Sequence, residues 1–135
     1  MENEIKRIDL PKIKDPRGNL SFVQSLDQIP FEIKRTYWIY DVPGGETRGG
    51  HAFRKQEEFI IALSGSFEVY IHDGDSEKIF SLNRSYYGLY LPQGLWRQMR
   101  NFSTNALALV VSSTLFNEQD YIREFEEFQK IFSRK

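Results

Sequence analysis

The chain has 135 residues, 40% hydrophobic and 15% aromatic, so one domain with a substantial apolar core is expected. Its 18 basic and 19 acidic residues leave a net charge of -1 without a basic stripe, which excludes a nucleic acid polymer as partner. The absence of cysteine excludes disulfides and thiolate metal sites and favours a cytoplasmic protein. The acidic N-terminus predicts no signal peptide, and no apolar run approaches the roughly 20 residues of a membrane span.

Short apolar segments separated by turn residues fill most of the chain. Residues 5–10 form an extended segment, and Asp15–Asn19 has the Pro and Gly of a turn. Many short strands at regular turn spacing predict an all-β fold, an antiparallel sandwich or barrel. The expected strands are Leu20–Leu26, Ile33–Tyr40, His51–Phe53, Phe59–Leu63, Phe67–His72, Lys78–Leu82, Tyr86–Leu91, Trp96–Phe102 and Leu107–Ser112.

The C-terminal segment has a different period. Tyr121, Phe125, Phe128 and Phe132 recur at steps of three or four residues, as on one face of a helix. Asn117 and the acidic residues after it are typical of a helix start. We therefore expect one amphipathic helix over about residues 117–134, packed on the barrel or on a partner chain.

The segment Gly45–Gly65 has the spacing of a known motif: Gly, five residues, His, one residue, a second ligand position, four residues, Glu, six residues, Gly. This order resembles the first motif of the cupin barrels, with His51 and Glu58 in place and Phe53 where the second histidine usually stands. The whole chain, residues 1–135, is therefore expected to form a single cupin domain: an antiparallel cupin or jelly-roll barrel with a C-terminal α-helix.

His51 is a candidate general base. It is the one side chain of the motif with an ordinary pKa near neutrality, and it follows a Gly-Gly pair that lets a ligand approach the backbone closely. The alternative is a structural histidine satisfied in the core or at the surface. His72, which precedes the Asp73-Gly74 turn, is expected at an exposed hairpin end without a chemical role.

The second cupin motif lies in Pro92–Asn101, and Arg97 occupies its histidine position. A phenylalanine cannot ligate a metal and an arginine stays cationic, so Phe53 and Arg97 together predict no zinc, iron or manganese site. An arginine in the pocket favours an anionic ligand or an ion pair with Glu58. A purely structural buried pair between Glu58 and Arg97 is the alternative.

Tyr37 is the remaining candidate for proton chemistry. It shares a strand face with Arg35, and a phenol can donate a proton or stabilise an enolate. The alternative is a core tyrosine with its hydroxyl at the surface.

Several segments together carry a resemblance to one family, the cupin-type dTDP-4-keto-6-deoxyglucose 3,4-ketoisomerases. These segments, which span nearly the whole chain, are Asp15-Pro16-Arg17-Gly18-Asn19-Leu20, Ile29-Pro30-Phe31, Lys34-Arg35-Thr36-Tyr37, Arg48-Gly49-Gly50-His51-Ala52, Trp96-Arg97-Gln98-Met99 and Asp120-Tyr121-Ile122-Arg123. The resemblance implies a cofactor-free and metal-independent homodimer, often with exchanged N-terminal strands, that serves deoxysugar biosynthesis for surface glycans such as lipopolysaccharide O-antigen. It also implies that His51 is the base and that Tyr37 and Arg48 occupy active-site positions.

The implied substrate is a dTDP-linked 4-keto-6-deoxy sugar. His51 would remove the C3 proton and return it at C4 through an enediol, moving the keto group from C4 to C3. Arg97, Arg48 or Tyr37 would stabilise the enediolate. Arg35 or Arg48 would hold the pyrophosphate, and Trp96 would lie against the sugar or the thymine.

Other functions stay open at this point. A 3,5-epimerase-like enzyme would also use a histidine base but would exchange the proton at C5. A non-catalytic cupin that binds a sugar nucleotide, or one that only supports a partner, is favoured by the missing second histidine at Phe53. A metal-dependent dioxygenase is the third alternative.

Overall fold

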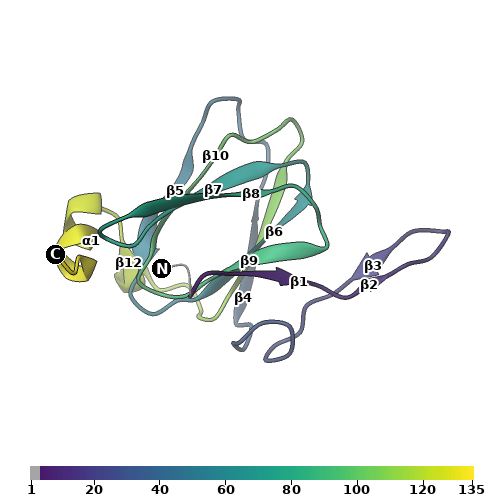
Figure 1. Ribbon diagram of the computed structural model, residues 1–135, viewed down its shortest axis with the longest axis horizontal. Coiled ribbons are helices and arrows are strands. Elements are labelled where there is room, and N and C mark those ends of the chain that lie inside the picture. Colours follow the sequence, from purple (N-terminus) through teal and green to yellow (C-terminus); the bar gives the residue numbers. More distant parts are fainter. Residues whose placement is uncertain (1–3) are drawn as a thin grey trace.

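Two five-stranded antiparallel sheets, packed face to face, form the body of the protein in a computed structural model that describes residues 4–135 (Figure 1). The first sheet has the spatial order β1 (Lys6–Asp9), β9 (Tyr87–Leu91), β6 (Glu58–Ser64), β11 (Leu107–Ser112), β4 (Arg35–Ile39). The second has the order β12 (Tyr121–Ile122), β5 (Arg48–Phe53), β10 (Trp96–Arg100), β7 (Phe67–His72), β8 (Glu77–Leu82). The expected antiparallel barrel is thus confirmed. Residues 1–3, part of the acidic N-terminus from which no signal peptide was predicted, lie outside the described residues.

Alternating apolar residues place the core between the two sheets. Phe67, Val69 and Ile71 of β7 are buried, while the residues between them are half-buried. This alternation follows from the two-residue period of a strand. The buried residues of this core are Ile5, Ile60, Ala62, Phe67, Val69, Ile71, Leu82, Tyr87, Leu89, Leu91, Leu95, Met99, Ala108 and Val110.

The outer face of each sheet is also covered. A second cluster, which includes Ile29, Phe31 and Phe59, buries the outer face of the first sheet under residues 22–34. A third cluster packs Trp96 and Ile122 of the second sheet against Phe128 of the C-terminal helix. Side chains on both faces of β6 are therefore buried, which explains its continuous apolar sequence.

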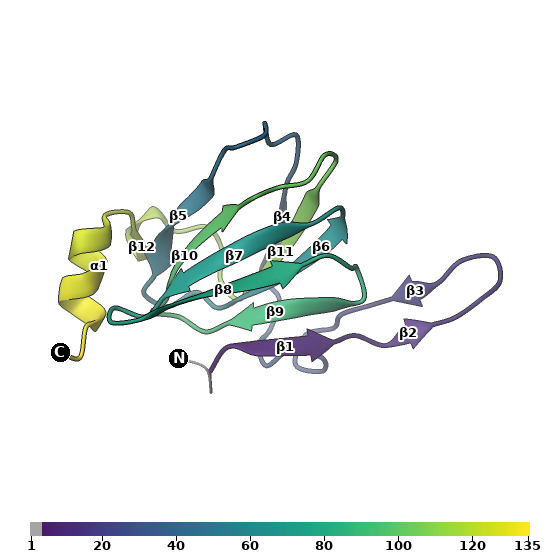
Figure 2. The same cartoon turned by 45° about the horizontal axis from the view of Figure 1, so that its top comes forward.

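The N-terminal part of the chain forms a projecting arm. Strands β2 (Lys12–Ile13) and β3 (Leu20–Ser21) pair through a turn and extend away from the body, on the side opposite α1 (Figure 2). The expected strand Leu20–Leu26 is therefore wrong beyond Ser21. Leu26 takes a positive φ of 61°, and its N–H donates to the Phe31 carbonyl at 3.0 Å, so the chain turns back over the first sheet.

The C-terminal helix is shorter than expected. The segment consists of a 3-10 turn η1 (Glu118–Asp120), then β12, and only then helix α1 (Phe125–Phe132), so the prediction of one helix over about 117–134 is wrong. Tyr121 and Ile122 instead pair with Phe53 and Ala52 of β5. Tertiary strand pairing therefore overrides the helical period of the sequence.

Most other strands lie within three residues of their expected ends, and β7 and β11 coincide with them. In the part of the chain that the structure describes, no helix is long and apolar enough to cross a membrane.

Asp120 ties the C-terminal segment to the second sheet, and its loss should destabilise the fold. Its buried carboxylate accepts hydrogen bonds from the backbone N–H groups of Lys55 at 2.8 Å and Gln56 at 3.0 Å. Asp120→Ala leaves both donors without an acceptor and is expected to lower the free energy of unfolding by about 2 to 4 kcal/mol in urea denaturation. Asp9→Ala, which removes an exposed ion pair with Arg7, is the matched control and should change the free energy of unfolding far less. Equal effects of the two substitutions would contradict this role of Asp120.

Candidate active site

A cavity of about 380 Å³ opens at one end of the barrel, where β4, β5, β6, β10 and β12 come together. Its wall carries charged side chains, aromatic rings and the Gly-Gly pair that precedes His51. The residues that line it are Arg35, Tyr37, Trp38, Ile39, Arg48, Gly49, Gly50, His51, Glu58, Arg97, Met99, Tyr121 and Arg123.

Strand alternation and register bring the polar residues of the cavity together. Arg35 and Tyr37 are two residues apart on β4 and share one face. Arg97 of β10 pairs directly with His51 of β5, and the register shifts between Arg97 and Met99. Arg97 and Met99 are two residues apart and share one face of β10, whereas their partners His51 and Arg48 are three apart on β5. The extra residue on β5 thus lets both Arg48 and His51 lie opposite this face and contribute to the cavity wall.

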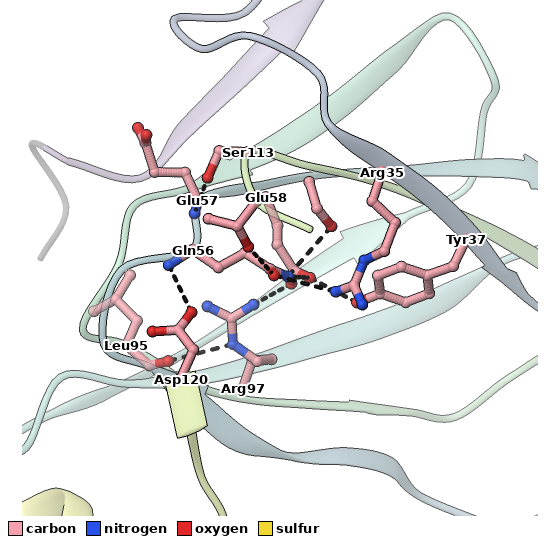
Figure 3. A network of polar contacts seen from close by, with 11 residues as sticks. Arg35, Tyr37, Gln56, Glu57, Glu58, Leu95, Arg97, Ser113 and Asp120 are labelled. Carbon is pink, nitrogen blue, oxygen red and sulfur yellow. Dashed lines mark hydrogen bonds and ion pairs between the residues drawn. The ribbon is translucent and has the colours of Figure 1, made fainter. Parts of the chain in front are cut away.

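The Glu58 carboxylate is the centre of the polar contacts beneath the cavity (Figure 3). Both Glu58 and Arg97 are about 1% exposed, and the Arg97 guanidinium donates a hydrogen bond to Oε1 of Glu58. The other oxygen, Oε2, accepts from the Tyr37 hydroxyl at 2.6 Å and from the Gln56 amide at 2.7 Å. An ionised carboxylate with three such donors is well compensated for its burial.

The His51 imidazole lies between two aromatic rings. Its ring centroid is 4.7 Å from that of Phe53 and 5.1 Å from that of Tyr121. Burial, together with the positive charges of Arg97 and Arg123, lowers the pKa of His51 to about 3. The free imidazole is therefore neutral near neutral pH, the form that can accept a proton.

The Tyr37 hydroxyl stays protonated. Burial raises the pKa of Tyr37 far above its ordinary value, and the neighbouring Glu58 carboxylate raises it further. The phenol donates a hydrogen bond to Glu58, so Tyr37 can orient this carboxylate but is not poised to act as a phenolate base.

The cavity has a strong excess of positive charge. Four arginines line it against one carboxylate, that of Glu58. Three buried side-chain nitrogens lack a hydrogen-bond partner among the described residues: Nε of Arg35, Nε2 of His51 and Nη2 of Arg97. All three residues line the cavity, so the arrangement can bind an anion beside a neutral imidazole.

The two residues that depart from the cupin motif contact each other. The Arg97 guanidinium lies over the Phe53 ring, 5.0 Å from its centroid. Within residues 4–135, no group of three or more His, Asp or Glu side chains could hold a metal ion together.

Six of the seven predicted site residues line the cavity: Arg35, Tyr37, Arg48, His51, Glu58 and Arg97. Trp96 does not, because it precedes Arg97 on β10 and therefore points to the opposite face, where its ring packs against Phe125 and Phe128. The geometry thus removes Trp96 from the residues that could contact a ligand in this cavity.

His72 also lies outside the cavity. Its ring is half-buried and packs edge-on against Phe125, with centroids 5.0 Å apart, and its Nδ1 accepts from the Gly74 N–H at 2.9 Å. The expected exposure of His72 is therefore corrected.

Three residues of the site were not predicted: Gln56, Tyr121 and Arg123. Tyr121 and Arg123 were expected on a helix, and only the pairing of β12 with β5 brings them to the cavity. The signal that could have found them is the segment Asp120-Tyr121-Ile122-Arg123, which is part of the resemblance. For Gln56, no motif or spacing in the sequence could have indicated its hydrogen bonds to distant residues such as Arg35 and Thr114.

The double-sheet barrel and its cationic cavity with one imidazole define a cupin-type protein, and the positive charge of the cavity suits a small anionic ligand. Comparison with known proteins makes this class more specific. A family model described as WxcM-like, C-terminal matches residues 3–133. A TDP-4-oxo-6-deoxy-alpha-D-glucose-3,4-oxoisomerase of Aneurinibacillus thermoaerophilus is 37% identical over 134 residues, which cover 99% of this chain and 95% of that protein.

Solved structures agree with this match. A 3,4-ketoisomerase from Helicobacter canadensis is 41% identical with a TM-score of 0.92, covering 95% of this chain and 96% of that one. A mutant of the 3,4-ketoisomerase QdtA from Thermoanaerobacterium thermosaccharolyticum, in complex with TDP-4-keto-6-deoxyglucose, is 32% identical with a TM-score of 0.96, covering 100% and 98%. The chain therefore belongs to the WxcM-like family of sugar 3,4-ketoisomerases.

The low pKa of His51 predicts a specific pH dependence of stability. The unfolded chain binds a proton at this imidazole near 6.5, whereas the folded protein binds it only near 3, so lowering the pH through this window favours unfolding. The free energy of unfolding should therefore fall more steeply with decreasing pH in the wild type than in His51→Asn, as measured by urea denaturation. NMR titration of the imidazole is the direct check, and a midpoint for His51 near 6.5 would refute this account.

Proposed function

We propose that this protein moves the keto group of a TDP-linked 4-keto-6-deoxy sugar from C4 to C3, within deoxysugar biosynthesis. The observation that carries the proposal is the unpaired Nε2 of a neutral His51 in a cavity lined by four arginines. The family supplies the substrate class, because a relative is a TDP-4-oxo-6-deoxy-glucose 3,4-oxoisomerase and another was solved with TDP-4-keto-6-deoxyglucose.

The proposed mechanism needs one base and a stabilised oxyanion. The C4 ketone acidifies the C3 hydrogen, which His51 removes as a proton. The electron pair of the C3–H bond forms the C3–C4 double bond of an enediolate, and the negative charge moves to O4. Imidazolium then returns the proton to C4, while the O3 hydroxyl proton is lost and O3 becomes the new ketone. A second proton passes from O3 to O4, so that the reaction is balanced without an oxidant or reductant.

In this mechanism Arg97 stabilises the negative charge on the substrate, and Glu58 positions Arg97. Arg97 neighbours His51 across the strand pair and has one unpaired nitrogen, Nη2, so it can stabilise charge on a substrate oxygen. Its Nη1 donates to Glu58, which holds the guanidinium in place. Tyr37, which donates to Glu58, acts through that carboxylate.

The diphosphate of the substrate is assigned to the arginines nearer the surface. Arg48 and Arg123 are exposed and line the cavity mouth, and Arg35 is half-buried beside them. Arg123 is held by Glu118, which accepts from its guanidinium at 2.9 and 3.0 Å. Arginine forks suit phosphate oxygens, which supports this assignment.

We further propose a homodimer in which the N-terminal arms are exchanged. The arm projects from the body, and Ile13 and Leu20 on it are 54% and 55% exposed, which is apolar surface that a partner copy would bury (Figure 2). The expected metal independence, the cytoplasmic location and the role in lipopolysaccharide synthesis stay predictions.

Replacement of His51 should abolish the reaction. In proton NMR of TDP-4-keto-6-deoxyglucose in deuterated water, the wild type should exchange the C3 proton and form a 3-keto product. His51→Asn should slow both by at least roughly a hundredfold, because the base is lost. TDP binding by calorimetry should persist in this variant.

His72→Asn is the matched control, since it removes the other histidine, which lies outside the cavity. The His72→Asn variant should exchange the C3 proton and form the 3-keto product at the rate of the wild type. Binding of TDP without C3 exchange in the wild type would instead support a non-catalytic binding protein, and exchange at C5 would support a 3,5-epimerase.

Arg48 should contribute to nucleotide affinity. Arg48→Ala removes a charged hydrogen-bond donor from the cavity mouth and should raise the TDP dissociation constant roughly tenfold or more, with a weaker dependence on salt. Arg84→Ala is the control, because Arg84 is exposed outside the cavity and bonds the backbone carbonyl of Asn83. An unchanged dissociation constant in Arg48→Ala would remove Arg48 from the phosphate site.

A further inference from the structure

The Gln56 side chain, 1% exposed, uses the full hydrogen-bonding capacity of its amide beneath the cavity (Figure 3). Its Nε2 donates to Oε2 of Glu58 at 2.7 Å and to Oγ of Ser112 at 3.2 Å. Its Oε1 accepts from Nη2 of Arg35 at 3.1 Å and from Oγ1 of Thr114 at 2.6 Å. One amide therefore joins a carboxylate and a guanidinium that both line the cavity.

The charges of its two main partners decide the orientation of the amide. If the amide were turned over, its oxygen would face the Glu58 carboxylate and its NH₂ group would face the Arg35 guanidinium. Both contacts would be repulsive, and two donor–acceptor pairs would be lost. The amide is therefore held in one orientation.

The backbone of Gln56 is held as firmly as its side chain. Its N–H donates to the buried Asp120 carboxylate at 3.0 Å, and Lys55 donates to the same carboxylate at 2.8 Å. The Arg54 N–H donates to the Asp120 carbonyl at 3.0 Å. Gln56 is thus a rigid link between the C-terminal segment and the cavity.

We propose that Gln56 is a positioning residue that couples the two ends of the active site; this rests on the proposed ketoisomerase function. At one end, Gln56 orients Glu58, whose carboxylate holds Arg97 beside His51. At the other end, it orients Arg35, whose Nε is buried and unpaired. Gln56 does not itself line the cavity, so it acts through these neighbours.

Loss of the amide releases both ends at once. Glu58 keeps Tyr37 and Arg97 as donors but loses the second of the two donors to its Oε2 atom, the Gln56 amide. Arg35 loses the Gln56 oxygen that accepts from its guanidinium and keeps ring contacts with Tyr37 and Phe116. Small displacements of catalytic groups have large effects on rate.

Gln56→Met tests this role, because methionine has a similar length but cannot hold either partner. In the full-length protein, its kcat for TDP-4-keto-6-deoxyglucose should fall roughly tenfold to a hundredfold at saturating substrate. The fall in kcat should persist under conditions where thermal unfolding shows the variant to be fully folded. A kcat within about twofold of the wild type, with only a lower unfolding temperature, would overturn the proposal.

Gln56→Glu adds a pH readout that a merely structural residue would not give. The new carboxyl group would face the Glu58 carboxylate, and the pair would share one proton at low pH. The shared proton mimics the amide N–H, so kcat relative to the wild type should be highest at low pH. It should decline as rising pH removes this proton. A ratio of kcat values that is independent of pH would count against the proposal.

Gln98→Glu is the matched control for charge. Gln98 lies on β10 outside the cavity, and the same substitution there should leave kcat and its pH profile unchanged. A loss of activity in this control equal to that of Gln56→Glu would overturn the proposal, since added negative charge alone would then explain the effect.

A readout that does not depend on turnover separates this proposal from the proposed function. In ligand-free protein, the guanidinium N–H signals of Arg35 should exchange slowly with water in the wild type and fast in Gln56→Met, as measured by ¹⁵N NMR. If the wild type does not turn over the ketosugar but this difference appears, only the ketoisomerase function fails. If Arg35 exchange is the same in both, the positioning role of Gln56 fails.

Discussion

The buried ion pair between Glu58 and Arg97 is the constraint on which the site depends. Glu58 lies on β6 of the first sheet and Arg97 on β10 of the second, so the pair joins the two sheets across the barrel. Taking both charges out of water is costly. If one partner were removed, the remaining buried charge would destabilise the fold by several kcal/mol. The hydrogen bonds that Tyr37 and Gln56 donate to the second carboxylate oxygen of Glu58 therefore help to offset the cost of burying this charge.

The same ion pair explains how the site differs from a metal-binding cupin. Arg97 and Phe53 occupy positions where that motif has imidazoles, and they contact each other as cation and ring. Arg97 also faces His51 and helps to keep its imidazole neutral. The result is a cationic cavity with a neutral imidazole, in which an anionic ligand would offset the positive charge around His51.

Much of the site could be predicted from local patterns, and the failures have physical causes. Arg35 and Tyr37 were placed on one face of a strand by the two-residue period alone. The same period should have separated Trp96 from Arg97, because adjacent residues on a strand point to opposite faces. Gln56 was not predicted, since its hydrogen-bond partners, apart from Glu58, are 21 to 64 residues distant in the chain.

The sequence by itself determined the all-β class, the positions of most strands and the motif positions of His51, Glu58 and Arg97. These depend on short-range periodicity, turn residues and motif spacing, which are local properties. The tertiary structure decided that Tyr121–Ile122 is a strand rather than a helix, because pairing with β5 and the burial of Asp120 outweigh the helical period. It also decided which distant side chains meet beneath the cavity, because strand pairing across the barrel is a property of the whole chain.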